Sequence, residues 1–188
     1  SETSNALDKL FVRNISTNIE QELIFSDETI YVPGVSLVQR DRDTDEIYLG
    51  YSSPKTPSRV YKYNLSNKSK ILVKEQEIPS GHDPENYIVE RVEFKSHDGR
   101  LVPLTITRHK KTKTDGSANL LLYGYGSYGN SMSPSFSSTR LSLIDRDIIW
   151  ATAHIRGGME KGMKWWKEGK LTNKKNTFED YIHAGKYL

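Results

Sequence analysis

The sequence has 188 residues, is 35% hydrophobic and 27% charged, and carries a formal net charge of +3. This length allows one large domain or two small ones with a buried core. The absence of cysteine excludes disulfides, thiolate zinc sites and a cysteine nucleophile. The small net charge argues against a nucleic-acid or anionic-membrane partner, and no apolar run approaches the roughly 18 residues of a membrane span. We therefore expect a globular, cytoplasmic protein, and Ser1–Leu10 lacks the pattern of a signal peptide.

Residues 1–78 are predicted to form an all-β segment. Short runs rich in Val, Ile, Tyr and Phe recur there, separated by polar turn clusters such as Ser52–Ser58 and Ser66–Ser69. The predicted strands are Leu10–Ile15, Glu22–Phe25, Thr29–Val32, Glu46–Tyr51, Arg59–Leu65 and Ile71–Lys74. This spacing suits a sheet meander, a sandwich or the blades of a propeller.

A Pro/Gly/Ser cluster at Ile78–Gly81 predicts a domain boundary, so that residues 79–188 form a second domain. The Asp98-Gly99 dipeptide near the start of this domain is a strong signal for a hairpin turn. The predicted strands are Ile88–Lys95, Leu101–His109, Asn119–Tyr123 and Asp147–Ile155, and the predicted helices are Ser135–Asp145, Lys161–Lys167 and Thr177–Leu188. Strand and helix alternate, and the last strand is apolar almost throughout. This pattern predicts an α/β domain with a mixed, mainly parallel sheet.

The segment Leu122–Gly129 follows a predicted strand and contains three glycines. Gly124, Gly126 and Gly129 have the spacing of the dinucleotide-binding fingerprint, which requires a helix to begin at once so that its N-terminus can hold a pyrophosphate. Residues 130–135 are instead rich in serine and contain a proline. Dinucleotide binding is therefore not expected.

Ser127, in the same segment, is not expected to be a nucleophile. A nucleophile elbow has glycine two residues before and two residues after the serine, whereas position 125 is tyrosine. In open α/β sheets, ligands bind at the carboxyl ends of strands, where a tyrosine hydroxyl can donate to a developing oxyanion. Two interpretations stay open. Either the segment binds a reacting carbonyl through a tyrosine, or it forms a turn whose glycines allow the backbone conformation and whose tyrosines cap the core.

A second segment, His154–Gly162, also follows a predicted buried strand. Arg156 and Glu160 within it either pair with each other to fix the loop or contact a charged substrate. His154 lies on the strand itself and is expected to be a core histidine rather than a base. The remaining histidines show no metal-ligand spacing, so no metal site is expected.

Six lysines surround Trp165 and Trp166 between Lys161 and Lys175. Such a pattern occurs on surfaces that bind single-stranded nucleic acid. It also occurs on solvated helix faces whose indoles are buried or half-buried. The modest net charge favours the solvated face, and no nucleic-acid partner is expected.

Together these segments resemble the prolyl oligopeptidase family, and among its branches oligopeptidase B (protease II) most closely. The motifs are Tyr123–Gly129, Arg140–Leu143, His154–Gly158, Gly169-Lys170 and Lys174–Tyr181. They are nearly colinear with the family pattern from about Ile88 to Leu188, and the first half resembles the family more weakly. The resemblance implies a fragment in which residues 1–78 are the closing blades of a β-propeller. Residues 79–188 would then be the N-terminal part of an incomplete α/β-hydrolase domain.

The resemblance also implies a serine endopeptidase that cleaves short peptides after Arg or Lys by Ser-His-Asp acyl transfer, without a cofactor. It assigns the oxyanion-hole donor to Tyr125, and it assigns the aromatic lining of the pocket for the residue before the scissile bond to Tyr128. Arg156 and Glu160 are the other candidate substrate-binding residues. The family's catalytic serine, aspartate and histidine have no counterpart in these 188 residues, so the chain alone is expected to be inactive.

Two further expectations accompany the resemblance. Met159 stands where the family usually has a third glycine, and its larger side chain either crowds a loop near the substrate or is tolerated there. A different class of function is the alternative: a non-catalytic remnant or binding module that complements a second chain. A complementing partner would copurify with the chain and restore hydrolysis.

Overall fold

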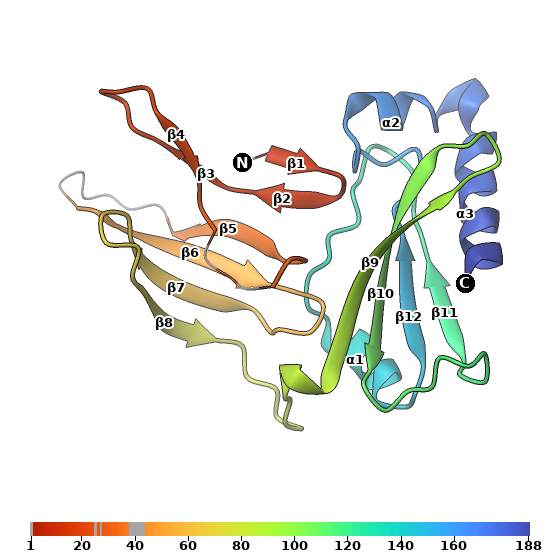
Figure 1. Ribbon diagram of the computed structural model, residues 1–188, viewed down its shortest axis with the longest axis horizontal. Coiled ribbons are helices and arrows are strands. Elements are labelled where there is room, and N and C mark those ends of the chain that lie inside the picture. The colour runs from red at the N-terminus through yellow and green to blue at the C-terminus, as the bar shows by residue number, and fades with distance from the viewer. Residues whose placement is uncertain (1, 25, 27, 38–43) are drawn as a thin grey trace. The chain divides into compact units, whose positions relative to one another are not determined.

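The computed structural model describes residues 2–24, 26, 28–37 and 44–188, which divide into two compact units (Figure 1). The described part of the first unit lies within residues 1–2, 8–82 and 134–136, and the second comprises residues 3–7, 83–133 and 137–188. The main division therefore lies between His82 and Asp83. The assignment of residues 1–78 to a propeller and of residues 79–188 to a hydrolase domain stays a prediction.

The first unit is built from antiparallel β-sheet. Its main sheet is a four-stranded meander in the order β5-β6-β7-β8, and β3 pairs with β4. The strands at this end of the chain are β1 (Glu2–Ser4), β2 (Leu7–Lys9), β3 (Phe11–Arg13), β4 (Glu20–Glu22), β5 (Val32–Leu37), β6 (Glu46–Ser52), β7 (Arg59–Asn64) and β8 (Lys70–Glu75). Leu10, Leu49, Tyr51 and Tyr63 form the buried core of the unit.

The predicted strands match the last three strands of this meander and differ earlier. β6, β7 and β8 coincide with their predictions to within one residue at each end. β5 begins at Val32 instead of Thr29 and contains Pro33. It is an edge strand of the sheet, where proline is tolerated because half of the backbone groups need no ladder partner. β4 ends at Glu22, and Phe25, the end of the predicted second strand, lies outside the described residues.

The second unit contains a four-stranded sheet in the order β11-β12-β10-β9. Its elements are the 3₁₀ turn η1 (Pro84–Asn86), β9 (Tyr87–Lys95), β10 (Leu101–His109), β11 (Leu120–Tyr123), α1 (Ser138–Ile144), β12 (Ile149–Ala153), α2 (Met163–Lys167), the 3₁₀ turn η2 (Leu171–Asn173) and α3 (Lys175–Tyr187). All four strands and three helices predicted for this part of the chain are present; β10 has the predicted ends, and the other elements are shifted at one or both ends. In the described part of the chain, no helix combines the length and apolar character needed to cross a membrane.

The sheet of the second unit is mixed, as predicted, but the prediction that it is mainly parallel is wrong. β11 and β12 are parallel, whereas β10 pairs antiparallel with both β9 and β12. The first two strands form a hairpin, which can only be antiparallel. Only the crossover through α1 joins two parallel strands. The alternation of strands and helices therefore predicted the direction of strand pairing correctly from β11 onward, but not for β9 and β10.

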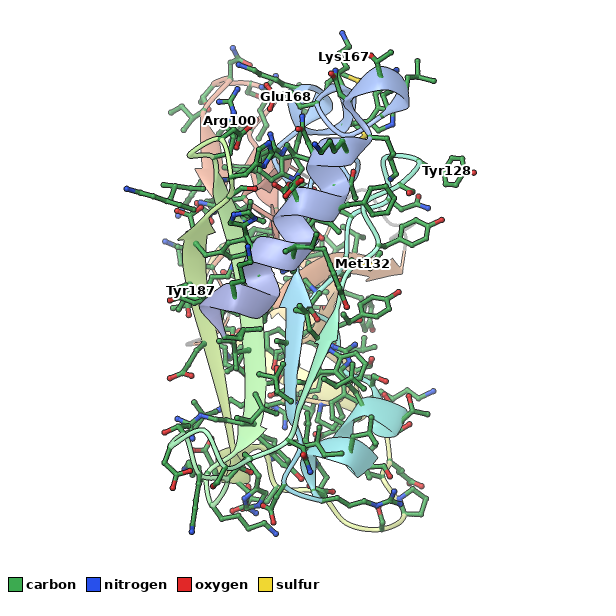
Figure 2. All side chains as sticks on the ribbon, turned by 90° about the vertical axis from the view of Figure 1, so that its right-hand side faces the viewer. Arg100, Tyr128, Met132, Lys167, Glu168 and Tyr187 are labelled. Carbon is green, nitrogen blue, oxygen red and sulfur yellow. The ribbon has the colours of Figure 1, made fainter. Side chains whose placement is uncertain are left out.

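Alternation along β12 sends neighbouring side chains to opposite faces of the sheet. Ala151 and Ala153 join a buried core that includes Ala184 of α3, and Figure 2 shows α3 running across the sheet. Trp150 packs on the other face, where the guanidinium of Arg140 from α1 lies 5.5 Å from the centroid of its ring. α1 and α3 therefore cover opposite faces. Because β11 and β12 are parallel, their carboxyl ends lie at the same edge of the sheet, between the layers of α1 and α3.

Candidate active site

The carboxyl ends of β11 and β12 continue into two loops that meet. Residues 124–129 follow β11 and residues 154–158 follow β12. The backbone N–H of Gly129 donates to the carbonyl oxygen of Gly157 over 2.9 Å. Figure 2 shows Tyr128 of the first loop projecting away from the protein. This strand edge is where ligands bind in open α/β sheets.

Glycines allow the two loops to cross in close contact. Gly157 has a φ of +100°, and a Cβ there would overlap the carbonyl oxygen of Gly126 and lie 3.0 Å from that of Gly169. Gly126 has a φ of +61°, and a Cβ there would lie 2.7 Å from Cγ1 of Ile155. Glycine adopts these conformations without steric cost. After the loop, α1 begins only at Ser138, so the glycine spacing serves the crossing of the chain rather than a pyrophosphate.

Tyr125 and Tyr128 present their side chains to solvent at this edge. Tyr125 is 41% exposed, and within the described residues its hydroxyl has no hydrogen-bond partner. Tyr128 is 87% exposed and has a φ of +56°, a left-handed conformation that costs a residue with a Cβ roughly 1–2 kcal/mol. Backbone strain of this kind clusters at functional sites. The geometry is compatible with the oxyanion and pocket roles, which stay predictions.

Lys174 holds the two residues that separate the tyrosines. Its Nζ donates to the carbonyl oxygen of Gly126 over 2.6 Å and to Oγ of Ser127 over 2.7 Å. Burial lowers the pKa of this lysine. The ammonium donates to a backbone carbonyl as well as to the serine hydroxyl. The two contacts together fix the conformation of the loop. Met159 packs against the same loop, since a Cβ on Gly129 would lie 3.1 Å from its sulfur.

Arg156 is held by two ion pairs, of which the one with Asp180 is buried and the one with Asp98 is partly exposed. Its guanidinium donates to Asp180 over 2.9 and 2.6 Å and to Asp98 over 2.5 and 3.2 Å. The side chains of Arg156 and Asp180 are 1% and 0% exposed. Burial by itself lowers the pKa of Arg156, but the two carboxylates outweigh this effect and raise it. The predicted pair with Glu160 is wrong, because Asp98 and Asp180 take its place. A contact between Arg156 and substrate stays a prediction.

A buried polar cluster surrounds His154. Its Nε2 lies 2.8 Å from both Nη1 of Arg91 and Oγ1 of Thr105, and Arg91 also donates to the carbonyl oxygen of Asn5. Since arginine has no acceptor, Nε2 accepts and the imidazole proton resides on Nδ1. Burial, and then the charge of Arg91, keep the pKa of His154 well below its ordinary value. His154 is thus a neutral core histidine, as expected, although β12 ends one residue before it.

Glu160 is buried beside this cluster, with 1% of its surface exposed. Its Oε1 accepts the N–H of Met132 over 3.0 Å, and its carbonyl oxygen accepts the N–H of Ala6 over 2.8 Å. Its Oε2 is buried with no hydrogen-bond partner among the described residues. Burial raises the pKa of this carboxyl, against the opposing effects of the Met132 N–H, its own backbone N–H and Arg91. Glu160 therefore ties the chain after the tyrosine loop to the N-terminal turn, and its substrate role stays a prediction.

Glu160→Gln is expected to gain stability relative to the wild type as the pH rises. Between the ordinary value of 4.5 and the raised native pKa, the folded protein keeps the Glu160 proton and the unfolded chain loses it. The folded state then binds more protons, so this group lowers wild-type stability as the pH rises through that window. Urea unfolding of both proteins on either side of pH 4.5 measures the difference. A constant difference, or the same trend for the exposed control Glu77→Gln, would contradict this assignment.

No sequence pattern predicted the contacts that Asp98, Asp180 and Lys174 make. Asp98 appeared only as a hairpin turn residue, and Asp180 only within the last helix and the Lys174–Tyr181 motif, because their partner Arg156 lies 58 and 24 residues away. No local pattern marks such distant contacts. Among the described residues, no cluster of His, Asp and Glu side chains is arranged to hold a metal ion.

Comparison with known proteins gives consistent matches. Residues 134–188 match the model of the prolyl oligopeptidase family. The chain is 40% identical to dipeptidyl aminopeptidase BI of Pseudoxanthomonas mexicana over all of this chain and 26% of that protein. It is 36% identical to protease 2 of Moraxella lacunata over 90% of this chain and 24% of that protein. The structure of oligopeptidase B from Leishmania major has a TM-score of 0.85 and 33% identity, covering 97% of this chain and 27% of that one. The chain thus spans about a quarter of the length of these relatives.

Proposed function

Because this chain belongs to the prolyl oligopeptidase family, we propose that it forms part of a serine-type oligopeptidase that hydrolyses short peptides after Arg or Lys. The peptidase class is supported by relatives named protease 2 and oligopeptidase B. The preference for Arg and Lys rests on the likeness to oligopeptidase B. A cytoplasmic location, consistent with the absence of cysteine, belongs to the same proposal.

The observation that carries this proposal is the position of Tyr125. Its hydroxyl is partly exposed, free of hydrogen bonds among the described residues, and mounted on a loop at the carboxyl edge of two parallel strands. A donor held there stabilises the charge that develops on a peptide carbonyl during acyl transfer. Tyr128, three residues later, would contact the side chain before the scissile bond.

The serine, histidine and aspartate of the triad are proposed to lie outside these 188 residues. In this sequence no serine has the flanking glycines of a nucleophile elbow. Lys174 holds Ser127 by donating to it, which does not remove the serine proton. The chain would therefore supply the oxyanion donor and part of the substrate site, and it would be inactive without the triad.

A second candidate activity is the release of dipeptides from a free N-terminus. The 40% identity to a relative named dipeptidyl aminopeptidase BI favours it, since this match covers all of the chain. The two activities differ in one requirement. Acetylation of the peptide N-terminus abolishes dipeptide release and leaves internal cleavage after Arg or Lys intact.

Labelling with a fluorophosphonate, which reacts with activated serines, tests the proposed function. We expect no label on the purified 188-residue chain and a label on an assembled enzyme that contains it. That enzyme should cleave acetylated peptides after Arg or Lys. A label on Ser127 of the chain itself would contradict our placement of the triad. No label on any species that contains the chain would favour the non-catalytic remnant or binding module instead.

In the assembled enzyme, Tyr125→Phe is expected to lower kcat by roughly ten- to a thousandfold, the range for losing one oxyanion donor. KM should change little, because the hydroxyl contacts the oxyanion mainly in the transition state. Steady-state hydrolysis of a peptide amide measures both constants. Tyr123→Phe is the matched control on the same segment and should leave kcat nearly unchanged. An unchanged kcat for Tyr125→Phe, or an equal loss in the control, would show that Tyr125 is not the donor.

A further inference from the structure

A cavity of about 480 Å³ lies beside Tyr128 in the second unit. The side chains that give it its chemical character are Ser127, Tyr128, Trp166, Lys170, Leu171 and Lys174. Three of these are apolar or aromatic and two are cationic, and none is acidic. Such a lining suits a ligand with an apolar body and a negatively charged group.

The two lysines are half-buried and retain donors for a ligand. Nζ of Lys170 lies 3.3 Å from the centroid of the Trp166 ring, which holds the ammonium by a cation–π contact. Lys174 donates to Gly126 and Ser127, and an ammonium has three protons. Lys170 is therefore the main cation available to a ligand, and Lys174 contributes a remaining donor.

The acidic side chains nearest in sequence are engaged elsewhere. Glu168 pairs with Arg100 over 2.8 Å, and Glu179 lies 3.9 Å from Lys175. Within the described residues, neither lysine of the cavity has a carboxylate at ion-pair distance. A partly buried cation without a counterion attracts an anion more strongly than a fully exposed cation does.

We propose that this cavity is a subsite for a peptide carboxylate close to the scissile bond, either the C-terminal carboxylate or an Asp or Glu side chain. The inference rests on the proposed function, because Tyr128 is the residue that places the cavity beside the scissile bond. Lys170 binds the carboxylate, and Trp166 and Leu171 contact the apolar part of the same residue. Two cations over a single cavity suit one carboxylate, whereas nucleic acid requires a row of phosphate contacts.

A titration that needs no catalysis tests the subsite on the 188-residue chain. The probes are acetyl-Ala-Arg-Ala-Ala with a free C-terminal carboxylate and the same peptide as a C-terminal carboxamide. Tryptophan fluorescence and calorimetry report binding. We expect the acid to bind about three- to tenfold more tightly than the amide, the range for one partly screened charge contact. A second pair of carboxamide peptides, with Glu or Gln after the arginine, distinguishes a side-chain carboxylate from the C-terminal one.

Variants identify the cation. Lys170→Met should abolish the preference for the acid, and Lys170→Arg should retain it. Lys167→Met, which removes the same charge from an exposed neighbouring lysine (Figure 2), should leave the preference unchanged. Circular dichroism shows whether each variant is folded, and the retained charge in Lys170→Arg separates a charge effect from a structural one.

Several outcomes would overturn the subsite. These are equal binding of carboxylate and neutral peptides in both pairs, no binding of any peptide, or an equal loss in Lys167→Met. RNA retention at low salt that Lys170→Met abolishes would assign the cavity to nucleic acid instead. Because binding is measured without hydrolysis, these failures leave the fluorophosphonate test of the proposed function untouched. A failure of that test in turn leaves the titration interpretable.

Discussion

Arg156→Met is expected to lower the free energy of unfolding by about 3–5 kcal/mol, the cost of removing one partner from a buried ion pair. The carboxylate of Asp180 is 0% exposed. The variant would remove the guanidinium that donates two hydrogen bonds to it. Asp98 would lose two hydrogen bonds, of 2.5 and 3.2 Å, as well. Chemical unfolding followed by circular dichroism measures the loss, with the slope against denaturant checked for two-state behaviour.

Two further variants separate burial from charge as the cause. Arg100→Met breaks the pair with Glu168, whose side chains are 46% and 23% exposed, and should cost only about 0–1 kcal/mol. The double variant Arg156→Met/Asp180→Asn should recover part of the loss, since no unpaired charge then remains buried. Equal losses for Arg100→Met and Arg156→Met would show that the buried network does not have the stabilising role inferred here.

Gly157→Ala is expected to cost about 2–5 kcal/mol of stability. A left-handed backbone costs a residue with a Cβ roughly 1–2 kcal/mol, and overpacking typically adds about 1–3 kcal/mol. Here the added Cβ would meet the backbone carbonyl of Gly126 rather than a flexible side chain, so relief requires one loop to move. Calorimetry should show a fall in Tm of several degrees or more, at roughly 2–4 °C per kcal/mol for a chain of this size.

Gly34→Ala is the matched control for this prediction. A Cβ on Gly34 would meet nothing within 4 Å, so we expect a change within about 0.5 kcal/mol. In the assembled enzyme, Gly157→Ala should also lower kcat, because Gly126 precedes Ser127 and Tyr128 in the displaced loop. A Gly157→Ala variant as stable and as active as the wild type would contradict the close crossing of the two loops.

The sequence was a good guide to the second unit where local chemistry decides the structure. The Asp-Gly turn located the β9–β10 hairpin, and the apolar run before His154 located β12. The direction of strand pairing was harder to predict, because it depends on which strand lies beside β10. That neighbour is β12, more than 40 residues later, and no pattern within β10 identifies it. The prediction of a mainly parallel sheet therefore applied to the whole sheet a rule that holds only for β11 and β12.

The candidate site shows the same division between local and distant information. The resemblance to the prolyl oligopeptidase family singled out Tyr125 and Tyr128, and the structure places both on the exposed strand edge. Spacing also suggested that Arg156 would pair with Glu160, four residues on. The structure gives Arg156 to Asp98 and Asp180 instead, and it buries Glu160. The charged residue types in this segment thus pointed to Arg156 and Glu160, but they did not identify the partners of either side chain.

The close crossing of the chain at Gly126, Gly157 and Gly169 has a consequence for the roles proposed for the two tyrosines. Tyr125 and Tyr128 are carried by main chain that this crossing constrains in the folded protein. A donor oriented in advance needs no reorganisation when charge develops on the carbonyl. Whatever motions accompany turnover, we expect the backbone carrying these two tyrosines to move as one rigid body.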